Sequence, residues 1–280
     1  MKLGSFELSL ISDGKFKLDG GAMFGVVPKF LWNKLEPADD KNRILLGLNC
    51  LLLERDGEKI LIDTGIGNKF DEKFARIYGV NREKTLLDRL TDKGISREDI
   101  SAVIMSHMHF DHIGWNTMRD GDGKLVATFP NATYFAQKGE FEAANNPDSR
   151  SKASYLVENW QPLLENDQLT LVSGTCEVLP GIESTIVGGH TQNNTIVKIK
   201  SGGETAVFLG DFIPTPSHLK TPYIMGYDLF PLEVMALKPG FLQQAAAEKW
   251  LLVFEHAAEP TAGFVTNNGR DWVLEKVDLS

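Results

Sequence analysis

The run His107 to His112, which reads HMHFDH, places four side chains that commonly bind metal ions within six positions. The chain has only 6 histidines among its 280 residues, so this concentration is not expected from composition. Neutral imidazoles two positions apart can converge on one cation, and the aspartate and histidine that follow can turn toward a second. No cysteine lies in the run, which argues against a thiolate-rich structural zinc site. We interpret the run as a metal centre that does chemistry.

Three further candidate ligands occur singly, later in the chain. His190 follows two glycines, Asp211 follows the run AVFLG, and His256 follows the run LLVFE. Each lies beside glycine or at the end of an apolar run, where the backbone can approach a ligand closely. A single residue of this kind is more often structural than functional. Together with the His107–His112 run, however, the three are best explained as parts of the same metal site.

Apolar and β-branched runs predict the strands that must position these residues. We expect strands at residues 6–11, 48–53, 59–62, 102–105, 132–135, 196–199, 206–209 and 251–254. Helical spacing is predicted within residues 64–100, where Leu86, Leu87 and Leu90 share a face, and over residues 151–164 and 241–250. Strands come early and late with helices between them, which favours an α+β fold of two sheets with helices outside.

The composition limits the class of protein. Hydrophobic residues make up 42% and charged residues 24%, as expected for a chain that packs as one domain over residues 1–280. The net charge of −9 disfavours a nucleic-acid partner. Cys50 and Cys176 are too few for a disulfide framework and favour a reducing, cytoplasmic location. The sequence shows neither a secretory pattern at the start nor a long apolar run, so we expect no membrane partner.

The sequence resembles the metallo-β-lactamase superfamily over nearly its whole length. The motifs that carry the resemblance are HMHFDH at residues 107–112, GGHTQNN around His190, FLGDF around Asp211 and FEHA around His256. The resemblance implies a four-layer αβ/βα sandwich with the metals at one edge of the two sheets. It also implies a hydrolase rather than a redox protein, because His109 stands where the diiron redox branch has glutamate.

The same resemblance implies which residues hold the metals. One ion would be held by His107, His109, His190 and Asp211, and the other by Asp111, His112, His256 and Asp211, with Asp211 shared. The implied cofactor is two divalent ions per chain, with zinc expected and manganese, iron or cobalt as alternatives. Asp111 and Asp211 would also be the catalytic carboxylates. Asp63, in LIDTG, is expected to accept a hydrogen bond from a ligand imidazole, and its alternative role is to cap the turn that follows.

Two longer segments resemble one branch of the superfamily. LDGGAMFGVVPKFLW near the start, and GDFIPTPSHL with the later MGYDLFP, are similar to quorum-quenching N-acyl-homoserine lactonases and methyl parathion hydrolases. We therefore expect a lactonase in which a hydroxide bridging the two metals attacks the ring carbonyl. The alternative is a phosphotriesterase or aryl-ester hydrolase. A thioester hydrolase is less favoured because no basic cluster is seen, and a nuclease because of the acidic charge.

The substrate pocket is predicted from fewer signals. Several small lactonases carry a tyrosine three residues after the bridging aspartate, whereas Pro214 stands at that position here, so the assisting phenol is expected from Tyr223 or Tyr227. The residues expected to line the pocket are Met23, Phe24, His218 and Tyr223. The apolar segment 18–42 is expected to be a flap over the pocket, a contact in a homodimer, or a loop anchored by its aromatic residues.

Overall fold

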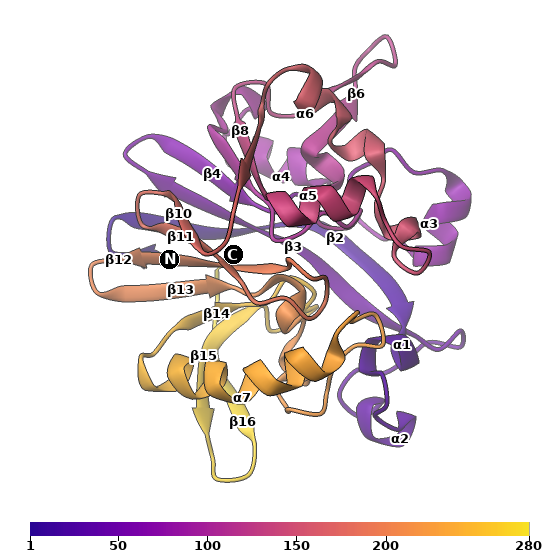
Figure 1. Ribbon diagram of the computed structural model, residues 1–280, viewed down its shortest axis with the longest axis vertical. Helices are drawn as coiled ribbons and strands as arrows, with labels where there is room; N and C mark the ends of the chain where they lie inside the picture. The colour runs from indigo at the N-terminus through magenta and orange to yellow at the C-terminus, as the bar shows by residue number, and fades with distance from the viewer. Residues whose placement is uncertain (280) are drawn as a thin grey trace.

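The computed structural model describes residues 1–279 and contains two seven-stranded sheets, shown as ribbons in Figure 1. The first sheet has, in spatial order, β1 (Lys2–Leu3), β2 (Phe6–Asp19), β3 (Arg43–Arg55), β4 (Glu58–Ile62), β5 (Ala102–Ile104), β8 (Thr133–Gln137) and β9 (Leu169–Val172). The second has β10 (Cys176–Leu179), β11 (Ile182–Ile186), β12 (Thr195–Ser201), β13 (Glu204–Phe208), β14 (Leu251–Val253), β15 (Ala262–Asn267) and β16 (Trp272–Val277). A separate hairpin pairs β6 (Thr117–Arg119) with β7 (Leu125–Ala127).

Apolar side chains from both sheets form the central core, because every second residue of a strand points to the same face. Leu51 and Ile62 of the first sheet share this core with Val197 and Phe208 of the second. Strands β4, β5, β8 and β9 run parallel to one another, and β13 runs parallel to β14. Parallel strands of this kind are buried on both faces, so the outer faces need helices.

Helices cover both outer faces and complete the four layers (Figure 1). Those that pack on the first sheet are α4 (Leu86–Asp92), α5 (Lys138–Asn145) and α6 (Gln161–Glu165), and α7 (Pro231–Ala247) packs on the second. The remaining helices are α1 (Gly20–Phe24), α2 (Lys29–Trp32) and α3 (Glu72–Tyr78). Among the helices described over residues 1–279, none is long and apolar enough to cross a membrane. The predicted α+β sandwich is confirmed.

The eight predicted strands are all present, but two helix predictions need correction. Residues 151–164 do not form one helix: two 3₁₀ turns, Lys152–Ser154 and Val157–Asn159, precede α6. Pro162 lies in the first turn of α6 and has no N–H to donate to a preceding turn, so a continuous helix cannot run through it. The helix predicted at 241–250 begins at Pro231 and ends at Ala247. Edge strands such as β10 and β16 lack fully buried residues and therefore gave no apolar signal.

Candidate metal centre

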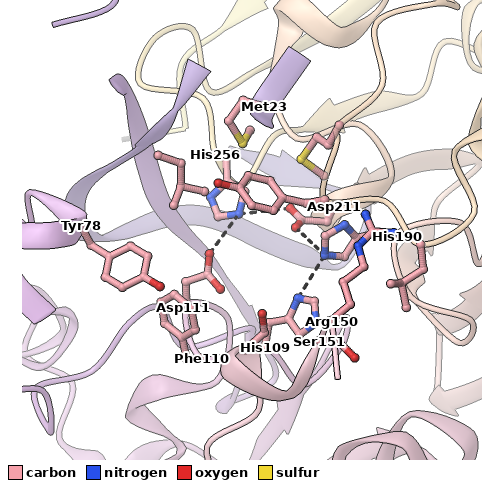
Figure 2. A pocket seen from close by; sticks show the side chains of 15 residues that line it. Met23, Tyr78, His109, Phe110, Asp111, Arg150, Ser151, His190, Asp211 and His256 are labelled. Carbon is pink, nitrogen blue, oxygen red and sulfur yellow. Dashed lines mark hydrogen bonds and ion pairs between the residues drawn. The ribbon is translucent and has the colours of Figure 1, made fainter. Parts of the chain in front are cut away.

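The seven predicted ligands meet at one edge of the sandwich. The His107–His112 run follows β5, and the other three ligands follow β11, β13 and β14. Gly189, directly before His190, has a φ of 86°, a conformation that glycine adopts without strain. Figure 2 shows the side chains that converge on one cavity, among them His109, Asp111, His190, Asp211 and His256. Sequence segments far apart in the chain thus form a single cluster.

The loop that carries four of the ligands is fixed by backbone contacts with the turn after β4. The Thr64 N–H donates to the His112 carbonyl at 2.6 Å, and the Gly114 N–H donates to the Gly65 carbonyl at 2.6 Å. A Cβ atom at Gly114 would collide with the backbone of Ile66, so only glycine permits this close approach. The contacts set the direction in which the ligand side chains leave the loop.

The first group of ligand atoms surrounds His109. His109 Nδ1 lies 3.0 Å from His107 Nε2 and 3.0 Å from His190 Nε2. His190 Nε2 also lies 3.1 Å from Asp211 Oδ2. His107, His190 and Asp211 are buried, and His109 is half-buried. They are the residues that the family resemblance implies for one ion.

The second group shares Asp211 with the first through its other oxygen. His256 Nε2 lies 3.1 Å from Asp211 Oδ1 and 3.2 Å from His112 Nε2. Asp111 Oδ2 lies 3.7 Å from the same His256 nitrogen. One carboxylate therefore presents one oxygen to each group, which is the arrangement needed to bridge two cations about 3.5–4 Å apart.

The donor atoms fit divalent cations. Ligands around a tetrahedral ion with metal–nitrogen distances of about 2.0–2.1 Å lie roughly 3.3 Å apart, close to the 3.0–3.2 Å separations of the facing nitrogens. Asp211 Oδ1 is buried and has no hydrogen-bond partner among residues 1–279, and it faces His256 Nε2 at 3.1 Å, so a cation held between the two atoms would satisfy both. Nitrogen and carboxylate donors accept zinc, manganese, iron or cobalt.

Carboxylates behind the cluster orient two of the ligand imidazoles. His112 Nδ1 lies 3.0 Å from Asp63 Oδ2 and 2.7 Å from Glu255 Oε2, and His190 Nδ1 lies 3.2 Å from Asp228 Oδ1. With Nδ1 as the donor, each Nε2 lone pair is left for a metal. Asp63, His112 and Glu255 could themselves group around an ion. We interpret them instead as a hydrogen-bonded set, because the His112 Nδ1–H group faces both carboxylates with its partial positive charge.

Sequence reasoning placed Asp63 in this role but missed Glu255 and Asp228. Glu255 had a usable signal, since it is a carboxylate at the end of the apolar strand LLVFE and directly precedes a predicted ligand. Asp228 had none: it lies 38 positions from His190 in an irregular segment, and only the folded chain brings them together.

The imidazoles differ in their protonation when no metal is present. Burial and the neighbouring imidazoles hold the pKa values of His107 and His109 well below the usual range. Burial alone would also lower the pKa of His112 and of His190, but the surrounding carboxylates reverse this and raise both values. The same balance, with Asp211 and Glu255 as the carboxylates, raises the pKa of His256 to about 9.

We expect metal uptake at pH 7 to release protons, about one to three per chain. A pKa of about 9 means that His256 carries a proton at pH 7, and a metal can bind its Nε2 only after that proton leaves. The release should decrease as the pH rises through about 9, because the imidazole is then already neutral. Calorimetric titration of the metal-free protein in buffers of different ionisation enthalpy measures it. No release at pH 7 would contradict this assignment.

A cavity of about 140 Å³ opens beside the metal cluster. Its apolar lining consists of Leu18, Met23, Phe110, Met225 and Leu229. Its polar lining outside the ligands consists of Tyr78, Arg150, Ser151, Ser154 and Tyr227. Figure 2 shows Tyr78 facing Asp111 across this space. The cavity therefore combines an apolar wall with two phenols and one guanidinium.

Of the four residues predicted to line the pocket, only Met23 does so. Phe24 is fully buried and stacks on Trp32 and His218, at ring-centroid distances of 5.5 and 4.5 Å, with the Tyr223 ring edge-on at 6.0 Å. His218 uses its Nε2–H to reach the Met23 carbonyl at 2.8 Å. These aromatic rings pack behind the pocket wall because stacking and burial satisfy them there. The prediction for Phe24, His218 and Tyr223 is therefore wrong.

Segment 18–42 forms part of the pocket wall and is anchored by its aromatic residues. Leu18 and Met23 line the cavity, while Phe24 and Trp32 are buried beneath them. Phe30, in contrast, is 67% exposed. The anchored-loop interpretation accounts for the buried rings, and the homodimer contact stays a prediction.

A family model and a curated relative both match this chain in sequence. A model of the Metallo-beta-lactamase superfamily matches residues 44–256. An N-acyl homoserine lactonase of Bacillus cereus is 28% identical over 178 residues, which is 60% of this chain and 64% of that protein. The chain thus aligns with less than two thirds of the length of this curated relative.

Two solved structures are similar over almost the whole chain. A probable metal-dependent hydrolase from Staphylococcus aureus is 32% identical with a TM-score of 0.90, and the match covers 99% of each chain. AidC, a dizinc quorum-quenching lactonase, is 23% identical with a TM-score of 0.78, covering 99% of this chain and 97% of AidC. At that identity, the likeness to AidC shows a common fold.

Proposed function

This chain belongs to the metallo-beta-lactamase superfamily, and from that premise we propose that it is a metal-dependent hydrolase that opens the ring of N-acyl-homoserine lactones. The proposed site uses two divalent ions, with zinc expected. A pair of ions held by the seven ligands and bridged by Asp211 would supply a water of lowered pKa and would polarise the carbonyl that is attacked. The protein's own part is to hold the ligands, shape the pocket and donate hydrogen bonds to the substrate.

The observation that carries the proposal is the character of the cavity beside the ligands. Its apolar wall, with Leu18, Met23 and Met225, favours an uncharged ring, because burying a charged group without a partner is costly. The similarity to N-acyl homoserine lactonases supports the same substrate class.

Tyr227, named from sequence as one of two candidate phenols, is the one that lines the cavity. Burial, with smaller contributions from nearby Asp19, Tyr78 and Asp111, raises its pKa to about 12. The phenol therefore keeps its proton at neutral pH and can donate it in a hydrogen bond to a carbonyl oxygen that gains negative charge. Tyr223 packs edge-on against Phe24 and is not placed for this role.

We expect Tyr227→Phe to lower kcat/KM for lactones by about 10- to 100-fold, since one hydrogen bond to the developing charge is lost. The metal content should not change. Steady-state kinetics on a homoserine lactone measures the effect, and Tyr223→Phe is the matched control with wild-type activity expected. Wild-type kinetics in Tyr227→Phe, with a loss in Tyr78→Phe instead, would transfer the role to the other phenol in the pocket.

A substrate panel tests the proposed function as a whole. The metal-loaded protein is assayed with N-hexanoyl- and N-decanoyl-homoserine lactone, an aryl ester, an aryl phosphotriester and single-stranded RNA. We expect kcat/KM to be highest for the lactones. A phosphotriester or aryl ester preferred by orders of magnitude would replace the proposal with the alternative hydrolase, and RNA cleavage would point to a nuclease.

A further inference from the structure

Arg150 is the one arginine or lysine that lines the cavity, within the part of the chain that the structure describes. It belongs to the segment between α5 and α6. The Asp148 side chain fixes this segment by accepting hydrogen bonds from the backbone N–H groups of Arg150, at 2.7 Å, and Ser151, at 3.0 Å. The backbone that carries the guanidinium is thus held in place before any ligand arrives.

One edge of the guanidinium is attached to the opposite wall of the cavity. Arg150 Nη2 donates to the carbonyl of Gly226 and, at 2.9 Å, to the carbonyl of Asp228. These two carbonyls flank Tyr227, and the Asp228 side chain faces His190. The guanidinium therefore connects residues 148–151 with residues 226–228. The latter include the Tyr227 phenol and the Asp228 carboxylate that orients the metal ligand His190.

Arg150 is an exposed residue, and the rest of its guanidinium donates no hydrogen bond to the described protein. Over residues 1–279, Arg150 makes no direct ion pair, although its charge attracts the neighbouring Asp148 carboxylate, and its Nη1 and Nε donate no hydrogen bond. A guanidinium has five N–H donors in a rigid fork. With Nη2 fixed to the protein, the remaining donors are available to a ligand, at a site already lined by apolar and phenolic groups.

We propose that Arg150 determines substrate specificity by binding an oxygen that the substrate carries outside its reacting ester, either a neutral carbonyl or a carboxylate. This inference rests on the proposed function, in which that oxygen is the amide carbonyl of an N-acyl-homoserine lactone. A lactone with only an alkyl side chain offers no such acceptor. Fixed donors lose little entropy when they bind, so the contact should discriminate between the two kinds of lactone.

The test compares matched γ-lactones in the metal-loaded protein. N-hexanoyl-homoserine lactone has the amide on the α-carbon of its ring. α-Heptyl-γ-butyrolactone has the same ring with an alkyl chain of matching length at the same carbon and no amide, and a third γ-lactone bears a carboxylate at that carbon. Arg150→Met removes the donors while keeping most of the side-chain volume, and Arg150→Lys keeps the charge. Lys152→Met, at an exposed position of the same segment that does not line the cavity, is the control.

We expect Arg150→Met to lower kcat/KM for the amide lactone by about 10- to 100-fold, the usual effect of losing a hydrogen bond to a charged donor. The loss for α-heptyl-γ-butyrolactone should be less than about threefold, Arg150→Lys should recover part of the activity, and Lys152→Met should be unchanged. A larger loss for the carboxylate lactone than for the amide lactone would identify an anionic acceptor. Equal losses for all three lactones would show that Arg150 only fixes the pocket wall, which overturns the proposal.

Binding separates a failure of this inference from a failure of the proposed function. If the wild-type protein opens no lactone, the proposed function fails, and calorimetry then tests Arg150 alone. The probes are the ring-opened N-hexanoyl-homoserine and its amide-free counterpart, 2-heptyl-4-hydroxybutanoate. Arg150→Met should weaken the Kd of the first by about tenfold or more and leave the second unchanged. Equal weakening of both, or no binding of either to the wild type, overturns the proposal.

Discussion

Asp211→Ala should lose most of both metal ions and lower kcat/KM by about 10³-fold or more. Asp211 is the residue that presents one oxygen to each ligand group, with Oδ2 3.1 Å from His190 Nε2 and Oδ1 3.1 Å from His256 Nε2. Removing it takes one negatively charged ligand from each site at once, and metal ions supply several kcal/mol of transition-state stabilisation in hydrolases of this kind. Elemental analysis and steady-state kinetics measure the two effects.

Two matched variants show whether the effect depends on the shared position. Asp111→Ala removes a carboxylate from the second group alone, so it should retain about one ion per chain. Asp122→Ala, at an exposed loop position, should retain about two ions and full activity. Circular dichroism confirms that the variants are folded. Wild-type metal content in Asp211→Ala would show that this carboxylate does not bridge the two sites.

Removal of the metals with a chelator should abolish hydrolysis and lower Tm by about 10 °C. A ligand that binds only the folded state stabilises it by about 4 kcal/mol at a concentration a thousand times its Kd, which is a shift of this size for a chain of this length. The structural cause is specific here: without cations the imidazole nitrogens face one another at 3.0–3.2 Å in a buried cluster.

Adding back zinc, manganese or cobalt should restore both activity and Tm, and the ion that restores most activity is the best candidate for the native metal. Asp211→Ala is the control, since its Tm should respond little to the chelator. Hydrolysis by protein that elemental analysis shows to be metal-free would exclude the metal-dependent reaction.

The ligand set could be predicted from sequence because each ligand combines a distinctive residue type with a distinctive place. The His107–His112 run is local, and Asp211 and His256 end apolar strands that the sequence itself indicates. The apolar runs of those strands also predicted two sheets with helices outside, since such runs are a local property of the chain, and the family resemblance implied the four-layer sandwich. The family resemblance then indicated which ligands share an ion.

The pocket, in contrast, was decided by tertiary packing. Phe24 resembles a pocket residue in sequence, yet stacking with Trp32 and His218 buries it behind the wall. Arg150 and Tyr227 lie in irregular segments without periodicity, and they line the cavity because the chain folds two distant segments across it. An exposed loop residue carries no sequence signal for the cavity it will face, since that depends on contacts between segments 76 or more residues apart.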